Sequence, residues 1–322
     1  MTTYKEIYGT NVEVLASDPT NPVEGQIWYN STSQTLKGYA LVAGSWATAG
    51  PLNTARGETT GCGTQTAGLC FGGVTPVVTG ATELYNGTTW TSNPNSMNSG
   101  RRRLAGTGIQ TAALAFGGLV SPGPVVGNTE SFNGTSWTEL NDLNTARYGL
   151  GAAGTNTAAL AFGGTPPNTG ATETWNGTSW TEVNDLNTAR ANLAGCGATN
   201  TAALAFGGFT TVDVGNTETW NGTSWTEVND LNTARTGLAG QAGTQTAALA
   251  IGGETTVVVG NTETWNGTSW TELNDLNIAR ELSGGAGTNT VGLTFGGNNP
   301  SIVASTEEWS GPAVQTVNIT VS

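Results

Sequence analysis

The chain repeats a 19-residue phrase, and the spacing of this phrase constrains the fold more than any other feature. TETWNGTSWTEVNDLNTAR occupies residues 172–190 and 217–235, and it returns at 262–280 with two substitutions. A glycine doublet and the arginine that ends the phrase recur at intervals of 43 to 46 residues, and a tryptophan follows the same period. The doublets begin at Gly72, Gly117, Gly163, Gly207, Gly252 and Gly296, and the tryptophans are Trp46, Trp90, Trp137, Trp180, Trp225 and Trp270. Six units of about 45 residues therefore fill residues 36–312.

Each unit reads as four short strands. A small, alternating segment such as NLAGCGATN (192–200) suits a crowded centre, and the following TAALAFGG (201–208) is typical of a strand buried on both faces. Two further segments, ATETW (171–175) and SWTEV (179–183), alternate and flank Asn176-Gly177. Asn-Gly favours a hairpin with a type I′ turn, in which both central residues have positive φ. No segment has a helical period, so the chain is predicted to be all-β.

Four-stranded units at this period predict a β-propeller with six blades. The alternative is an open β-solenoid, whose repeats are usually shorter. The ends of the repeat region favour the propeller. The last unit has TEEW (306–309) without a following outer strand, whereas GSWATAGPLNTAR (44–56) supplies an outer strand with no unit before it. We therefore expect the strand around Trp46 to complete the last blade and close the ring, which removes two open edges.

The domain organisation follows from this placement. The propeller is predicted over residues 36–312, after an attachment or oligomerisation segment over 1–35 and before a C-terminal strand over 313–322. The tail VQTVNITVS (314–322) alternates, so it is expected to add a strand either to the rim of the ring or to residues 1–35.

Composition excludes several classes of function. The net charge is −13 with only two lysines, so no nucleic-acid partner is expected. The chain has no apolar run near 18 residues and no secretory signal, so neither membrane insertion nor export is predicted. Because there is no histidine, the commonest general base and most zinc or copper ligand sets are missing. Cys62, Cys70 and Cys196 lack a metal-binding spacing and are expected to be small buried thiols, with a Cys62–Cys70 pairing left open.

The recurrent acidic residues do not indicate a catalytic pair. Glu173, Glu182 and Asp185 return at the same place in other units, whereas a catalytic pair should occur once. Acidic loops such as VNDLN (183–187) could offer oxygen ligands to calcium, but their spacing matches no calcium-loop signature. The chain is therefore predicted not to be an enzyme and to hold no cofactor or metal.

The order of residues in each unit resembles the kelch repeat. An arginine, a strand, an apolar strand ending in Gly-Gly, a glutamate before an aromatic residue and then a tryptophan follow one another through the units. This resemblance implies a kelch-type propeller, and the copper site of galactose oxidase, which has such a propeller, is excluded because it needs histidines. Only four residues separate Trp175 and Trp180, against about six in kelch units, so the outer hairpin is expected to be shorter.

The repeated charges are predicted to be structural. One arginine and one glutamate per unit suit a bidentate ion pair that satisfies loop carbonyls and locks adjacent blades, with a ring of binding charges as the alternative. The arginines are Arg56, Arg101, Arg147, Arg190, Arg235 and Arg280, and the glutamates are Glu83, Glu130, Glu173, Glu218, Glu263 and Glu307. Paired tryptophans such as Trp175 and Trp180 are expected to pack across strands and not to serve as sugar platforms. The Asn-Gly-Thr sequons are explained by their turns, so no glycosylation is expected.

A second resemblance lies before the repeats. SDPTNPVEGQIWYNSTSQTLKGY (17–39) is similar to a short hairpin segment common in tail-fibre and other virion proteins of bacteriophages. The near-verbatim repeats and the Thr/Asn/Gly-rich composition resemble proteins of marine phages. This resemblance implies a virion protein made in the host cytoplasm, a homo-oligomer, and contact with other virion proteins through residues 1–35.

Variation between units is concentrated on one face of the expected propeller. Turns between the first and second strands and between the third and fourth are nearly uniform, whereas the loops after each Gly-Gly and the two residues after each repeated arginine differ. Variable loops on a rigid scaffold are where binding usually occurs, although neutral drift is the alternative. The predicted binding residues are Arg102, Arg103, Tyr148, Asn192, Phe209, Asp213, Glu254 and Glu281.

These observations favour a phage virion component, a fibre or a head or tail appendage, whose variable face binds a host surface receptor or glycan. A self-assembling or capsid-decorating protein without host recognition is the first alternative. A secreted kelch-like lectin is the second.

Overall fold

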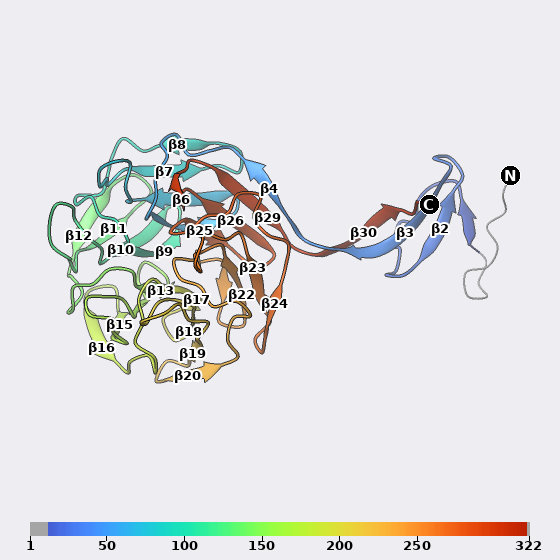
Figure 1. Cartoon of the computed structure of the whole chain (residues 1–322). Helices are drawn as coiled ribbons and strands as arrows, with labels where there is room; N and C mark the ends of the chain where they lie inside the picture. Colours follow the sequence, from blue (N-terminus) through green and yellow to red (C-terminus); the bar gives the residue numbers. More distant parts are fainter. Residues whose placement is uncertain (1–11, 321–322) are drawn as a thin grey trace. The chain divides into compact units, whose positions relative to one another are not determined.

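The computed structural model describes residues 12–320, and within that range it is built from β-strands without helices. Residues 12–320 accordingly offer no helix that could cross a membrane. The strands form seven four-stranded sheets and a two-stranded ribbon of β27 (Asn298–Asn299) and β28 (Ser301–Ile302). The chain divides into two compact units, one from Met1–Gly44 with Gly311–Ser322 and one from Ser45–Ser310. Six of the sheets belong to Ser45–Ser310, where they are arranged around a common centre (Figure 1).

The six sheets of Ser45–Ser310, here called repeat sheets 1 to 6, are all antiparallel. Sheet 1 contains β5 (Thr60–Thr64), β6 (Ala67–Phe71), β7 (Thr82–Tyr85) and β8 (Trp90–Ser92), and sheet 2 contains β9 (Ala105–Ile109), β10 (Ala112–Phe116), β11 (Thr129–Phe132) and β12 (Trp137–Leu140). Sheet 3 contains β13 (Gly151–Gly154), β14 (Ala159–Phe162), β15 (Thr172–Trp175) and β16 (Trp180–Val183), and sheet 4 contains β17 (Ala194–Thr199), β18 (Ala202–Phe206), β19 (Thr217–Trp220) and β20 (Trp225–Val228). Sheet 5 contains β21 (Gly243–Thr244), β22 (Ala247–Ile251), β23 (Thr262–Trp265) and β24 (Trp270–Glu272), and sheet 6 contains β25 (Gly284–Gly287), β26 (Val291–Phe295), β29 (Thr306–Ser310) and β4 (Ser45–Ala49).

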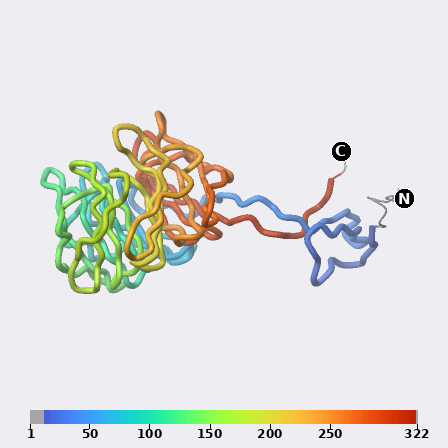
Figure 2. Tube along the Cα trace, turned by 90° about the horizontal axis from the view of Figure 1, so that it is seen from below, coloured from blue at the N-terminus to red at the C-terminus, as the bar shows by residue number. Residues whose placement is uncertain are grey.

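Sheet 6 is made from both ends of the repeat region. β4 pairs with β29 from Ser45↔Ser310 to Ala49↔Thr306, with Trp46 opposite Trp309. The start and the end of Ser45–Ser310 therefore lie side by side (Figure 2). The strand around Trp46 thus lies where its sequence predicted. The first strands of sheets 1 to 5 also pack against one another in order, and β25 of sheet 6 packs against β5 of sheet 1, which is consistent with a propeller.

The apolar second strand of each unit is buried because it lies between two neighbouring sheets. In sheet 2, Ala113 to Phe116 are fully buried. The Phe116 ring lies 4.8 Å from the ring of Trp180, which belongs to sheet 3. Within sheet 3, Trp180 also packs on its cross-strand partner Trp175, with the ring centroids 5.3 Å apart. Both tryptophans are buried, so they serve packing as expected and cannot stack on a sugar.

The outer hairpins differ from the predicted type I′ turn. Trp175 pairs with Trp180, so the loop has four residues, and only Gly177 has positive φ (91°). The side chain of Asn176 stabilises the turn instead, because its Oδ1 accepts hydrogen bonds from the N–H groups of Thr178 and Ser179, each at 2.9 Å. An asparagine side chain that imitates a backbone turn removes the need for positive φ at the first position.

The seventh sheet has the order β1-β2-β3-β30 and belongs to the smaller unit. Its strands are β1 (Glu13–Leu15), β2 (Ile27–Asn30), β3 (Thr35–Val42) and β30 (Ala313–Asn318), and only the β1–β2 pair is parallel. The predicted boundary between the attachment segment and the propeller, between residues 35 and 36, therefore falls inside β3. The physical reason is that β3 pairs with the C-terminal strand from Lys37↔Asn318 to Val42↔Ala313, so residues 36–42 belong to the smaller unit. Residues 1–11 of the expected attachment segment lie outside the described residues.

One network of hydrogen bonds around the partly exposed Asp18 organises this small sheet. Asp18 accepts hydrogen bonds from Trp28 Nε1 at 3.0 Å, Asn30 Nδ2 at 2.7 Å and Lys37 Nζ at 2.7 Å. The Lys37 contact, followed by those of Asn30 and Trp28, lowers the pKa of Asp18 to about 2. The carboxylate of Asp18 thus connects the start of the segment SDPTNPVEGQIWYN to β2 and β3 by hydrogen bonds.

Candidate functional site

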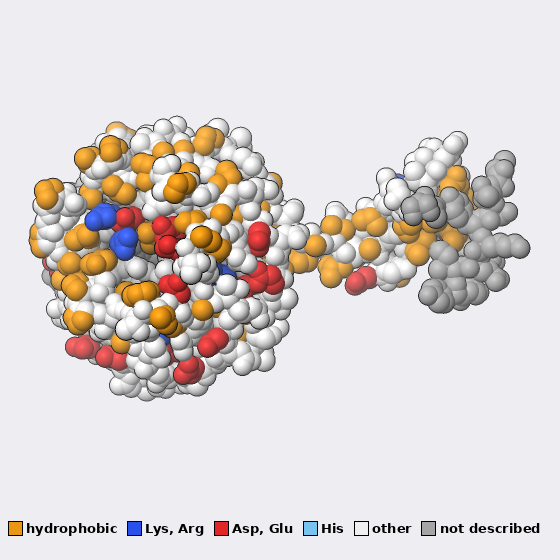
Figure 3. Space-filling view, in the orientation of Figure 1, with side chains coloured by type: hydrophobic (Ala, Val, Ile, Leu, Met, Phe, Trp, Pro, Cys, Tyr) orange, Lys and Arg blue, Asp and Glu red, His pale blue; other side chains and the backbone are white. Residues whose placement is uncertain are grey.

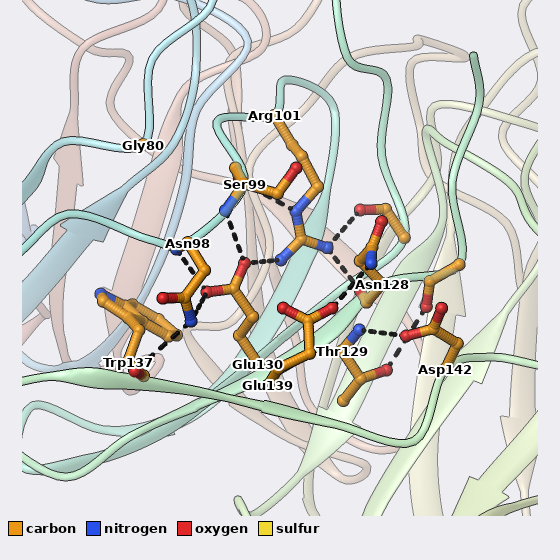
Figure 4. Close-up of polar contacts among 12 residues, drawn as sticks. Gly80, Asn98, Ser99, Arg101, Asn128, Thr129, Glu130, Trp137, Glu139 and Asp142 are labelled. Atoms are coloured by element: carbon orange, nitrogen blue, oxygen red, sulfur yellow. Dashed lines mark hydrogen bonds and ion pairs between the residues drawn. The ribbon is translucent and has the colours of Figure 1, made fainter.

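The repeated arginine lies beside the repeated glutamate in every unit, as Figure 4 shows for Arg101 and Glu130. Arg101 Nη2 donates to Glu130 Oε1 at 2.8 Å, while Nη1 donates to the carbonyls of Gly117 and Asn128. The second oxygen, Glu130 Oε2, accepts from the backbone N of Asn98 at 2.7 Å and from its Nδ2 at 3.0 Å. The pair is therefore not the bidentate one predicted, because the carboxylate divides its oxygens between the arginine and an asparagine.

The same arrangement recurs in the other units and is inaccessible to ligands. The remaining pairs are Arg56–Glu83, Arg147–Glu173, Arg190–Glu218, Arg235–Glu263 and Arg280–Glu307, and their side chains are at most 2% exposed. The arginine backbone reaches the preceding sheet, since the Arg101 carbonyl accepts from the N–H of Gly73 at 2.8 Å. Each arginine thus connects a Gly-Gly of one sheet with the glutamate of the next. Burial lowers the pKa of Arg101 and Arg280, and the paired glutamates oppose that shift.

The second residue after each arginine forms a collar at the inner ends of the six sheets. The collar residues have left-handed backbone with φ between 50° and 63° and are Glu58, Arg103, Gly149, Asn192, Gly237 and Leu282. Five consecutive N–H groups donate to the carbonyl of the preceding collar residue, from Arg103 N to Glu58 O at 2.9 Å through to Leu282 N to Gly237 O at 2.6 Å. Glycine adopts this backbone freely, whereas other residues lose roughly 1 kcal/mol. Four of the six positions nevertheless carry a side chain, and strained backbone of this kind is concentrated at functional sites.

Six of the eight predicted binding residues line one hollow of about 360 Å³. They are Arg103, Asn192, Phe209, Asp213, Glu254 and Glu281. The hollow, here called the variable-face hollow, is formed by collar residues and by the loops that follow the Gly-Gly doublets of sheets 4 and 5. Those loops are held by bridges to the residues after the arginines, such as Ala191↔Phe209 and Thr236↔Glu254. Phe209 is 39% exposed, so a large apolar side chain is available beside the charged groups.

The other two predicted residues are placed differently. Arg102 Nη1 donates to both carboxylate oxygens of Glu58, at 2.9 and 2.8 Å, and Arg103 Nε donates to Glu58 Oε2 at 2.9 Å. Glu58 therefore binds Arg103, which lines the hollow, although Glu58 does not line the hollow itself and only its position after Arg56 indicated it. Tyr148 does not line the hollow; its N–H donates to the carbonyl of Thr165 at 3.0 Å. Thr236, Gly237, Thr255 and Leu282 complete the lining and were not among the predicted binding residues.

The hollow has an uneven charge distribution. Burial, followed by repulsion from Glu254, raises the pKa of Glu281 to about 7, and the same two causes raise the pKa of Asp213. Arg103 opposes the shift of Glu281. Figure 3 shows basic side chains beside acidic ones near the middle of one face of the larger unit. Within Ser45–Ser310 the partly exposed basic side chains are Arg102 and Arg103, at 28% and 27%, because the other six arginines are buried.

Gln241, in a unit that is one residue longer than most, lies between two cavities at the centre of the sheets. The interval from the arginine to Gly-Gly is one residue longer in units 4 and 5 than in the others. Unit 4 takes up the extra residue as a register shift between Cys196 and Thr199. In unit 5, Gln241 turns inward with φ of 69°; its N–H donates to Gly195 O at 2.9 Å and its Nε2 to Ala152 O at 3.2 Å. Gln241 lines both the cavity below the collar and a cavity of about 320 Å³ at the opposite end.

The remaining candidate side chains are the three cysteines, which are buried, and the acidic residues of loops such as VNDLN. All three cysteines are free and buried, and burial raises the pKa of Cys62 and Cys196 to about 12 and of Cys70 to about 11. In the VNDLN loop, Asp185 Oδ1 accepts the N–H of Thr172 at 3.2 Å. Over residues 12–320, no three His, Cys, Asp or Glu side chains are grouped so as to hold a metal ion.

No family model matches this chain, and no curated protein matches it. Its resemblance to kelch repeats and to virion proteins therefore depends on the motifs described above.

Proposed function

We propose that the chain is a non-enzymatic bacteriophage virion protein that displays a six-bladed, closed, kelch-like propeller, and that its variable face binds a host surface receptor or glycan. The observation that carries the proposal is the convergence of six residues, chosen because they vary between units, into one hollow. Neutral drift would scatter variable residues around the face. A shared hollow with an exposed aromatic side chain and strained backbone is typical of a binding site.

Contacts between sheets support six blades and closure. The outer tryptophan of a sheet donates from Nε1 to a threonine Oγ1 of the preceding sheet, as in Trp137–Thr82 at 2.9 Å and Trp225–Thr172 at 3.1 Å. The same contact joins sheet 1 to sheet 6, where Trp90 Nε1 donates to Thr306 Oγ1 at 2.9 Å. The N–H of Gly297 likewise donates to the carbonyl of Arg56 at 2.9 Å. The first and last sheets thus meet through the same bonds as consecutive sheets.

The chemistry of the hollow favours a polar ligand with an apolar face, such as a glycan. Carboxylates accept hydrogen bonds from hydroxyl groups, an amide can donate and accept, and a guanidinium donates in a fixed plane. Asp213, Glu254, Asn192 and Arg103 supply these groups, while Phe209 offers an aromatic surface for sugar C–H groups. A few polar groups around an apolar contact are what orients a small ligand.

The virion part of the proposal is supported by the segment at residues 17–39. This segment contains β2 and most of β3, which belong to the smaller compact unit and not to the repeat sheets. A separate unit can hold the chain to other virion proteins while the propeller is displayed. Deleting residues 1–35 should then abolish incorporation into particles; unchanged incorporation would contradict anchoring through this segment.

Ligand binding is tested by screening the purified full chain on a glycan array and repeating the screen with Phe209→Ala and Asn192→Ala. A matched control is Thr178→Ala, which alters an exposed turn on the uniform face. Both hollow variants should weaken binding at least about tenfold, because central contacts in a binding site contribute more than about 1.4 kcal/mol. Loop exchange at Arg102-Arg103, Tyr148 and Phe209 should also reduce adsorption to host cells. Unchanged adsorption, together with a blank array, would leave a structural role without host recognition.

A further inference from the structure

We propose that β30 is a subunit interface, at which its outer edge pairs antiparallel with the β30 edge of a second copy of this chain. The inference concerns the attachment unit of the proposed function, but it stands whether or not the variable-face hollow binds a ligand.

The direction of the backbone groups in β30 follows from the hydrogen bonds on either side of β3. Ile319 N donates to Leu36 O at 2.8 Å, so the N–H of Ile319 points toward β3. Tyr39 N donates to Gln26 O at 2.9 Å, so Tyr39, which lies opposite Thr316, directs its backbone toward β2 instead. Because hydrogen-bonded and non-hydrogen-bonded pairs alternate along an antiparallel ladder, the backbone groups of Val314, Thr316 and Asn318 point away from the sheet. No residue from 12 to 320 pairs with that outer edge.

The outer edge of β30 also lacks the features that protect sheet edges. Exposed edge strands usually carry charged residues, proline or a bulge, since an unprotected edge is a template for another strand. β30 reads Ala-Val-Gln-Thr-Val-Asn, with no charge, no proline and an unbroken register to β3. By contrast, the opposite edge strand of the same sheet, β1, begins with Glu13, and the outer strands of four of the six repeat sheets carry Glu139, Glu182, Glu227 and Glu272.

A second copy of the chain fits this edge by symmetry and by charge. A two-fold axis through Thr316 sets Thr316 against Thr316 of the other copy and Val314 against Asn318, so that all three outward residues are paired. Each such pair exchanges two bonds, which makes about six backbone hydrogen bonds. The chain has a net charge of −13, so two copies repel each other over most of their surfaces. The uncharged β30 edge is a place where they can approach without that cost.

The test is the mass of the purified full chain in solution, measured by native mass spectrometry and light scattering over a range of concentrations. The wild-type chain should be a dimer that dissociates on dilution. Thr316→Pro removes an outward N–H and leaves the β3–β30 ladder bonds, so it should weaken dimerisation at least about tenfold. Thr316→Val, which keeps the N–H, is the matched control and should remain dimeric. Thr316→Lys places two like charges opposite each other and should also weaken the dimer, with the effect reduced by salt. This variant keeps the test decisive if the proline variant fails to fold.

Hydrogen exchange supplies a second readout. In the dimer the amides of Val314, Thr316 and Asn318 should be protected, and they should lose protection on dilution. A chain that is monomeric at every concentration overturns the proposal, including the case of a monomer with protected amides. A dimer that persists in both Thr316→Pro and Thr316→Lys also overturns it, because the interface then lies elsewhere. None of these results bears on the glycan screen, so the two proposals fail separately.

Discussion

Removing Glu130 should destabilise the repeat sheets more than removing any exposed acid. In Glu130→Ala the guanidinium of Arg101, which is fully buried, loses its counter-charge. The backbone N and the Nδ2 of Asn98 lose their acceptor in the same step. Breaking a buried ion pair from one side costs about 3–5 kcal/mol, because the remaining charge is desolvated and unpaired.

The matched control is Glu139→Ala on the neighbouring strand. Glu139 lies directly opposite Glu130, but it is exposed and accepts one hydrogen bond, from Asn128 Nδ2 at 2.7 Å. Its removal should change the free energy of unfolding by less than about 0.5 kcal/mol.

The assay is thermal and urea unfolding of the full chain followed by tryptophan fluorescence. A loss of 3–5 kcal/mol should lower the melting temperature by roughly 10 °C for a unit of this size. The double variant Arg101→Met, Glu130→Leu should be about 1–3 kcal/mol more stable than the sum of its single variants, since no charge is left buried. If Glu130→Ala costs no more than Glu139→Ala, the interpretation of the repeated arginine–glutamate pair as a structural lock is wrong.

Three further predictions concern the contact between sheets 1 and 6, the hollow and the glycines. Trp90→Phe removes the hydrogen bond to Thr306 between sheets 1 and 6 and should lower the free energy of unfolding by about 1 kcal/mol. Trp225→Phe removes the matching bond to Thr172 and should lower it by about the same amount. A much smaller cost for Trp90→Phe in urea unfolding would contradict closure of the ring. Because the pKa of Glu281 is raised from 4.5 to about 7 in the folded chain, the folded state holds more protons in this window, so the free energy of unfolding should fall as the pH rises from about 4.5 to about 7. Glu281→Gln should flatten that fall, and melting curves with equal pH dependence in both proteins would exclude Glu281 as its cause. Gly237→Ala should cost about 1 kcal/mol, because its φ is 62° and an added Cβ finds no atom closer than 3.3 Å. Gly154→Ala should cost considerably more, since its Cβ would lie 2.2 Å from the carbonyl of Ala158; equal melting temperatures would refute this steric argument.

Local patterns in the sequence identified the parts of each unit. The period, the four strands and the position of β4 beside β29 were readable because alternation and apolar runs report how a strand is buried. The arginine and glutamate of each unit were also identified, since both recur with the period. Details of geometry were not readable. Glu130 could bind Arg101 with both carboxylate oxygens, or bind Arg101 with one oxygen and Asn98 with the other. Which of these occurs depends on the path of a loop that the sequence does not describe.

The hollow required the tertiary structure. Variation between units identified a face, but it did not indicate that Asn192, Phe209, Asp213, Glu254 and Glu281 would converge, while Tyr148 would not. Gln241 is a single inserted residue, and only the folded chain shows that it turns inward across the centre.

By itself, then, the sequence determined the repeat, the strands and the residues that vary. The tertiary structure decided which variable residues share a site, that residues 36–42 join the C-terminal strand, and which backbone groups of β30 remain unpaired. The physical reason is that periodicity records the environment of each residue along one strand. Proximity between units depends on how the sheets pack, and that is not encoded in any one of them.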